Sequence, residues 1–265
     1  MLKEEKQTPA DVIIFNIYDD DHFRNLDSWR NIRVNKHERF TEPPLPHPVV
    51  NPTKGTFKEM PNPCPTEEIL YRLLDYDWVH NRFKDDFALG IEVAHLDAES
   101  ANPIKNYSDL IDLATNHGIR TRADDYPTLE KAAHALHQEA ALFSTSRLIE
   151  KIDAYAENNG KKIIYVLSYP ADRIAEGIDS GSRWDQPFVD FIKKRKNPVI
   201  DLFDSHISDH SENYKIALRP YLKKFFMGHY NPRGNFFCAQ ALKDTLVEAL
   251  DPKPIAYRDN PKIMN

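Results

Sequence analysis

The sequence predicts an α/β protein whose core is a parallel β-sheet. Three apolar runs, at residues 12–18, 161–169 and 199–203, have the composition of strands that are buried on both faces. Segments with helical apolar spacing precede the second run, separate it from the third and follow the third. Such an alternation gives parallel strands joined by right-handed crossovers. We therefore expect one domain over residues 1–265, with an insertion at residues 34–126.

Residues 2–7 are expected to form the end of a helix that leads into the first apolar run. A polar cluster follows this run. Open α/β sheets bind ligands at such carboxyl ends of strands. The cluster contains Asp19, Asp20, Asp21, His22, Arg24 and Asn25. One hypothesis is a Mg²⁺ or Mn²⁺ site that uses these carboxylates, His22 and either His206 or His229. The other is a polar loop with an Asp-capped turn and an ion pair of Arg24.

Residues 30–125 lack strand character, and eight of the twenty-five residues at 41–65 are prolines. A segment so rich in proline is extended and non-helical, as suits an ordered arm over a surface. Short helices are expected at 66–78, 85–96 and 108–117, the last ended by Gly118. This insertion either shapes a substrate pocket or acts as a dimerisation arm.

The helix expected at 127–159 has an alanine-rich middle that allows close packing, and a further helix is expected at about 183–196. The last helix has Asn231 as its N-cap and Pro232 as its first residue, and it ends before Pro252. Gly234 is expected to let this helix approach the sheet closely. His229 precedes the helix, where the helix dipole favours a neutral imidazole. His229 is therefore either a general base or a residue that caps the turn.

Composition excludes several functional classes. The net charge of −6, without a dense basic block, argues against nucleic acid or an anionic membrane as the main partner. The chain has 8 glycines and neither glycine-rich nucleotide motif, so no nucleotide cofactor is expected. Cys64 and Cys238 are far apart and indicate neither a disulfide framework nor a zinc site. No apolar run approaches the length of a membrane span, so we expect a soluble chain whose compartment stays open.

Three strands are fewer than the five or six of a usual doubly wound sheet, and the first would expose an apolar edge. Either strands of another chain complete the sheet, as in a homo-oligomer, or the domain begins upstream of Met1. We expect the second.

The segment Gly228 to Asn235, together with the strand order, resembles the SGNH/GDSL hydrolase superfamily over residues 11–25 and 127–250. These esterases and acyl hydrolases have a three-layer α/β/α sandwich with a parallel, flavodoxin-like sheet. Their catalytic histidine lies before the last helix and is often followed by Asn and Gly, as His229 is by Asn231 and Gly234. The resemblance implies that His229 activates a serine to cleave an ester or related acyl bond of a small molecule or carbohydrate.

The sequence departs from the superfamily in three places. It has no Gly-Asp-Ser block, so the serine is expected upstream of Met1; Ser180 and Ser182 do not directly follow a strand, and a turn explains Ser168. Phe226, Met227 and Gly228 stand where the superfamily has its acid, which leaves Asp201, Asp204 and Asp209 as candidates. Asp20 stands where an asparagine helps to bind the oxyanion, and a carboxylate would repel that charge.

The residues expected to bind the substrate or the oxyanion are Asn16, Asp20, Asp21, Arg24, Asn25 and Asn231. Because a recognisable serine and acid are missing, the alternative is a non-catalytic binding or assembly relative that has lost the triad.

Overall fold

A computed structural model describes residues 10–34, 43–98, 104–214 and 217–252. Residues 2–7 and the start of the proline-rich segment lie outside this part of the chain. The chain divides into two compact units. The first unit comprises Met1–Asp19, Ile152–Trp184 and Lys193–Asn265, and the second comprises Asp20–Lys151 and Asp185–Ile192. The second unit is therefore larger than the insertion expected at residues 34–126.

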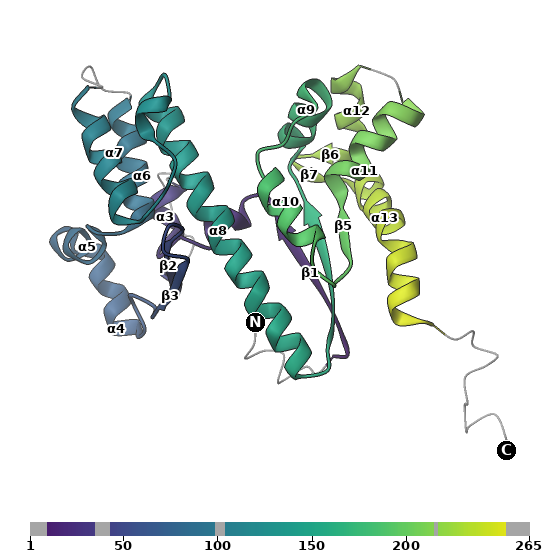
Figure 1. Ribbon diagram of the computed structural model, residues 1–265, viewed down its shortest axis with the longest axis horizontal. Helices are drawn as coiled ribbons and strands as arrows, with labels where there is room; N and C mark the ends of the chain where they lie inside the picture. The colour runs from purple at the N-terminus through teal and green to yellow at the C-terminus, as the bar shows by residue number, and fades with distance from the viewer. Residues whose placement is uncertain (1–9, 35–42, 99–103, 215–216, 253–265) are drawn as a thin grey trace. The chain divides into compact units, whose positions relative to one another are not determined.

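The first unit contains a three-stranded parallel sheet in the order β1–β4–β5 (Figure 1). The strands are β1 (Val12–Tyr18), β4 (Lys162–Ser168) and β5 (Val199–Asp201). Ile13 pairs with Ile163 across the first ladder, and Val166 pairs with Ile200 across the second. The prediction of a mixed α/β protein with parallel strands is confirmed.

The helices of the first unit precede the second strand, separate it from the third and follow the third. They are the last turns of α8 (Leu129–Asn158), α9 (Ala171–Ser180), α11 (Leu202–Asp209), a π-helical turn (His210–Tyr214), α12 (Leu218–Phe225) and α13 (Pro232–Leu250). A short hairpin of β6 (Phe226–Met227) and β7 (His229–Tyr230) lies between α12 and α13. The core on one sheet face joins Ile164, Val166 and Ile200 to Leu242 and Leu246 of α13.

Two expectations about the strands were wrong. Strand β1 is not buried on both faces. On the sheet face that packs against α13, Val12 is the one residue of β1 in the apolar core, and Ile14 is 49% exposed. The third strand ends at Asp201 and not at residue 203, because the Asp201 carboxylate accepts a hydrogen bond from the Phe203 N–H and so begins α11.

The second unit contains α2 (Asp21–Arg24), α3 (Arg30–Arg33), α4 (Glu67–Leu70), the 3₁₀ turns Tyr71–Leu74 and Ala123–Asp125, α5 (Tyr76–Phe83), α6 (Phe87–Ala98), α7 (Ile104–Asn116), the greater part of α8, and α10 (Gln186–Lys193) up to Ile192. Ala132, Ala133, Ala140 and Ala141 of α8 are fully buried, as close packing requires. The helices expected at 85–96, 108–117 and 127–159 correspond to α6, α7 and α8.

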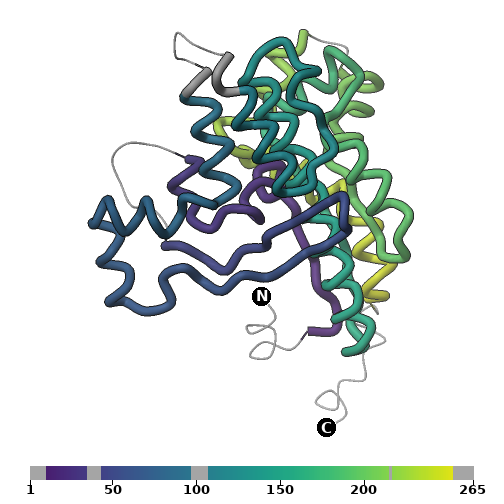
Figure 2. Tube along the Cα trace, turned by 60° about the vertical axis from the view of Figure 1, so that its left-hand side comes forward, coloured from purple at the N-terminus to yellow at the C-terminus, as the bar shows by residue number. Residues whose placement is uncertain are grey.

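The absence of strands from residues 30–125 was also a wrong expectation. Strands β2 (His47–Asn51) and β3 (Thr56–Met60) form an antiparallel hairpin, and Figure 2 shows them side by side. At the turn, Gly55 has a φ of 65° and the Asn51 side chain accepts a hydrogen bond from the Lys54 N–H. Proline supports extended backbone, and within the ladder only Pro48 lacks a donor, so the hairpin forms despite the proline content.

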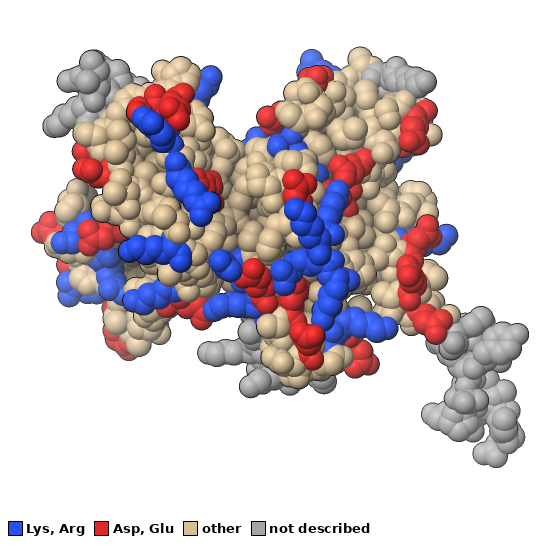
Figure 3. Space-filling view, viewed as in Figure 1, with Lys and Arg blue, Asp and Glu red and all other residues tan. Residues whose placement is uncertain are grey.

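Charged side chains of both signs are interspersed on the face shown in Figure 3. No helix in the described ranges is long and apolar enough to cross a membrane.

Candidate functional site

A groove of about 470 Å³ in the first unit contains His229, the residue that the sequence favours most as a general base. Its walls come from β1, the carboxyl end of β4, the β6–β7 hairpin and α13. Ile14, Val166 and Leu242 give it an apolar surface, and Asn16 adds a side-chain amide. Because no strand pairs with the second edge of β1 in the described chain, the groove adjoins an unpaired strand edge.

His229 is positioned by the hairpin and by the cap of α13. Gly228 has a φ of 79°, which favours glycine, and it lets Met227 pair with His229 across the turn. The Asn231 side chain then accepts hydrogen bonds from the backbone N–H groups of Arg233 and Gly234. The imidazole of His229 is exposed, and it has no hydrogen-bond or ion-pair partner within the described chain. It is therefore free to contact a bound molecule.

None of the three candidate acids contacts His229. Asp201 caps α11, and its second oxygen lies 2.7 Å from the Arg183 guanidinium in a pair that is almost fully buried. Burial raises the pKa of Asp201 despite the opposing charge of Arg183. Asp204 is paired with Lys193 at 2.7 Å.

The third candidate acid, Asp209, belongs to a chain of hydrogen bonds that sequence reasoning missed. The Tyr221 hydroxyl donates to Asp209 over 3.1 Å and lies 3.0 Å from Nδ1 of His206. Nε2 of His206 lies 2.9 Å from the Tyr230 hydroxyl, which is also hydrogen-bonded to the Cys238 thiol. Tyr230 and Cys238 line the groove, so the chain connects the groove with Asp209.

His206 is fully buried at the centre of this chain, and burial lowers its pKa to about 4. Its ring stacks on Phe237 with 4.2 Å between centroids. A neutral His206 with its proton on Nδ1 donates to Tyr221 and accepts from Tyr230, so that both ring nitrogens are satisfied. The aromatic residues between 221 and 237 were the only feature of the sequence that could have predicted a buried environment for His206.

The residues expected to bind the substrate or the oxyanion are not all brought together. Asn16 lines the groove, whereas both ends of the Asn231 amide are occupied, since its Nδ2 donates to the Lys224 carbonyl over 3.1 Å. The other four, Asp20, Asp21, Arg24 and Asn25, belong to the second unit. The amide of Asn25 donates to Thr145 over 3.2 Å.

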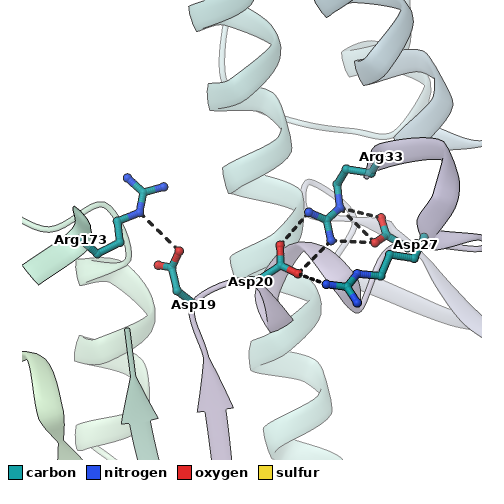
Figure 4. Close-up of polar contacts among 6 residues, drawn as sticks. Asp19, Asp20, Asp27, Arg33 and Arg173 are labelled. Carbon is teal, nitrogen blue, oxygen red and sulfur yellow. Dashed lines mark hydrogen bonds and ion pairs between the residues drawn. The ribbon is translucent and has the colours of Figure 1, made fainter. Parts of the chain in front are cut away.

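Asp20 is held by arginines of the second unit. Figure 4 shows Arg33 between the carboxylates of Asp20 and Asp27, and its closest contacts to them are 2.7 and 2.9 Å. Burial alone would raise the pKa of Asp20, but hydrogen bonds and the positive charge of Arg33 hold it below its usual value. These contacts give Asp20 a structural role.

In the described ranges, no three side chains of His, Cys, Asp or Glu lie close enough together to hold a metal ion. The hypothesis of a Mg²⁺ or Mn²⁺ site therefore has no set of ligands there. Asp19 instead accepts a hydrogen bond from the Trp184 indole at 2.7 Å and pairs with Arg173 at 3.4 Å. His22 is buried with its Nδ1 3.0 Å from the Thr145 hydroxyl, and His206 is enclosed by its aromatic neighbours.

Comparison of the chain with protein-family models, with curated proteins and with solved structures found no match.

Proposed function

We propose that this chain supplies the general base of a serine ester hydrolase of the SGNH/GDSL type, built on a three-layer α/β/α sandwich. The observation that carries the proposal is the position of His229, whose ring lines an apolar groove without a partner of its own in the described chain. An imidazole that no other side chain of the described chain engages can accept a proton from a group bound in the groove.

The nucleophilic serine is assigned to a further strand that pairs with the edge of β1 left unpaired in the described chain. A flavodoxin-like sheet has the order 2-1-3-4-5. The order β1–β4–β5 corresponds to the last three of those strands, so that the first strand of the full sheet would lie beside β1. The carboxyl end of a parallel strand in that position lies beside the groove, where its serine would reach His229.

The chemistry then follows the usual two steps of acyl transfer. His229 takes the serine proton as the serine oxygen attacks the acyl carbon, and it returns that proton to the departing alkoxide. Two residues of the groove, Asn16 and Asn235, have side-chain amides that can donate a hydrogen bond to an oxyanion. Water hydrolyses the acyl-enzyme by the same route in reverse. Ile14, Val166 and Leu242 favour an apolar acyl group.

Labelling with a fluorophosphonate probe tests the proposal on the protein isolated from its native cells. We expect one labelled serine, located by peptide mapping on a strand that precedes Met1. A His229→Gln variant should lower the labelling rate by about 10⁶-fold, as loss of a triad histidine does. A matched His80→Gln variant, which changes an exposed histidine of the second unit, should label normally.

Failure of the native protein to label would refute the hydrolase proposal. Label on Ser168 would keep the hydrolase and refute the added strand. Ser168 lines the groove, but its hydroxyl is buried and lies 3.5 Å from the Ile17 carbonyl.

A second candidate is a binding module that keeps the groove without catalysis. Met227 favours it, because Met227 pairs with His229 at the position where the superfamily has its acid. Saturable binding of butyrate by a protein that the fluorophosphonate never labels would support this reading.

A further inference from the structure

The second unit contains a cavity of about 310 Å³ that the proposed hydrolase does not use. It lies at the β2–β3 hairpin, the junction of α5 and α6, and the segment after α2. Val50, Phe83 and Phe87 are buried and form its apolar walls. The volume is at the lower end of the range for small-molecule pockets.

Ser28 is the first polar group of this cavity. The residue is 2% exposed, and its hydroxyl has no hydrogen-bond partner among the described residues. Because a buried hydroxyl without a partner is unfavourable, such groups in folded proteins point to a ligand or a water molecule.

Two carboxylates, Asp85 and Asp86, also line the cavity. One oxygen of Asp86 accepts the backbone N–H of Leu89 over 3.0 Å at the start of α6. Neither carboxylate forms an ion pair with any residue that the structure describes. The cavity therefore presents unneutralised negative charge beside an apolar wall.

The other ionisable groups do not cancel this charge. Arg82 is exposed and lines the cavity, so the acidic and basic side chains together leave one negative charge. The His117 ring packs on Phe87 with 4.9 Å between centroids, and burial lowers the pKa of His117, which favours the neutral ring. His47 places its Nδ1 3.2 Å from the Leu45 carbonyl.

We propose that this cavity binds a small organic amine with an apolar body. The ammonium group pairs with Asp86 and Asp85, the Ser28 hydroxyl accepts one of its N–H bonds, and the body packs on Phe83 and Phe87. A carboxylate ligand of the same shape would meet two like charges for each opposite one. The site is independent of His229 and of the hydrolase proposal.

Calorimetric titration of the complete chain with three ligands of one shape tests the site. The ligands are 2-phenylethylamine, 2-phenylethanol and 3-phenylpropionate, which differ mainly in charge. We expect the amine to bind in the millimolar range or tighter, and at least about tenfold more tightly than the other two, because an ionised partner strengthens the hydrogen bond.

Asp86→Asn should weaken amine binding at least about tenfold, because it removes the charge and keeps an oxygen that caps α6. Asp112→Asn changes an exposed carboxylate of α7 and is the matched control, with unchanged binding. If Asp86→Asn lowers the melting temperature, Asp85→Asn provides a second test, since Asp85 is exposed and caps no helix.

Equal binding of the amine and the acid would overturn the proposal. So would the absence of amine binding up to tens of millimolar, or unchanged affinity in both charge-removing variants.

Discussion

Acid should destabilise the first unit through His206. The ring is fully buried, and its pKa is lowered from 6.5 to about 4 by burial. The unfolded chain therefore binds a proton at His206 more readily than the folded protein does. Stability from this residue is present above about pH 6.5 and is lost as the pH falls toward 4.

The expected size follows from the pKa difference. One pKa unit corresponds to about 1.4 kcal/mol, so the full effect of His206 is about 3 kcal/mol. Between about pH 7 and pH 5 the unfolded state gains most of its proton while the folded state gains little. The free energy of unfolding should fall by about 2 kcal/mol over that interval because of His206.

Urea denaturation followed by circular dichroism at the two pH values measures this loss. Other histidines also titrate, so the informative quantity is the difference between wild type and His206→Gln. The variant should be less stable at pH 7, and its pH-dependent loss should be smaller by about 2 kcal/mol. His80→Gln is the matched control, because it removes an exposed histidine of the second unit, leaves the surroundings of His206 unchanged and should keep the wild-type pH dependence. Equal pH dependence in wild type and His206→Gln would refute the reasoning.

Three further predictions concern stability and are checked by urea denaturation. Gly234→Val should destabilise by about 3 kcal/mol, because a Cβ at Gly234 would lie 2.3 Å from the Phe225 carbonyl oxygen; an unchanged midpoint would contradict this close approach. Arg33→Met should destabilise by about 3 to 5 kcal/mol, because it leaves the buried carboxylate of Asp27 without its partner, and a change below about 1 kcal/mol would show that the pair is dispensable. His229→Ala should change stability by less than about 0.5 kcal/mol, since the side chain is exposed and has no partner in the described chain, and a larger loss would assign His229 a structural role.

Local sequence signals predicted those elements whose causes are local. The Asn231–Pro232 start of α13 needs only a capping side chain and a residue with a fixed φ, and both were readable. The alanine-rich helix was predicted to within two residues at each end as α8. The β2–β3 hairpin was missed because the proline content of this segment argued against strands. The evidence for the hairpin lies in its turn, where Asn51 and Gly55 set the geometry.

The exposed face of β1 could not be predicted from composition. An apolar run shows that the side chains of a strand can be buried. The packing of other elements decides which face of the strand is buried. The side chains of α13 pack mainly on β4 and β5, so Ile14 stays half exposed and a groove remains beside it.

Apolar periodicity and capping chemistry act over short distances along the chain, so the sequence alone was enough to specify the strand–helix order, the parallel sheet and a histidine before the last helix. Which polar groups meet depended on the tertiary structure. It placed Asp20 and Asn25 in a different unit from His229, enclosed His206 between Tyr221 and Tyr230, and left Ser28 without a hydrogen-bond partner in the described chain. The physical reason is that hydrogen bonds and ion pairs act over a few ångströms, between residues whose separation in the chain does not predict their separation in space.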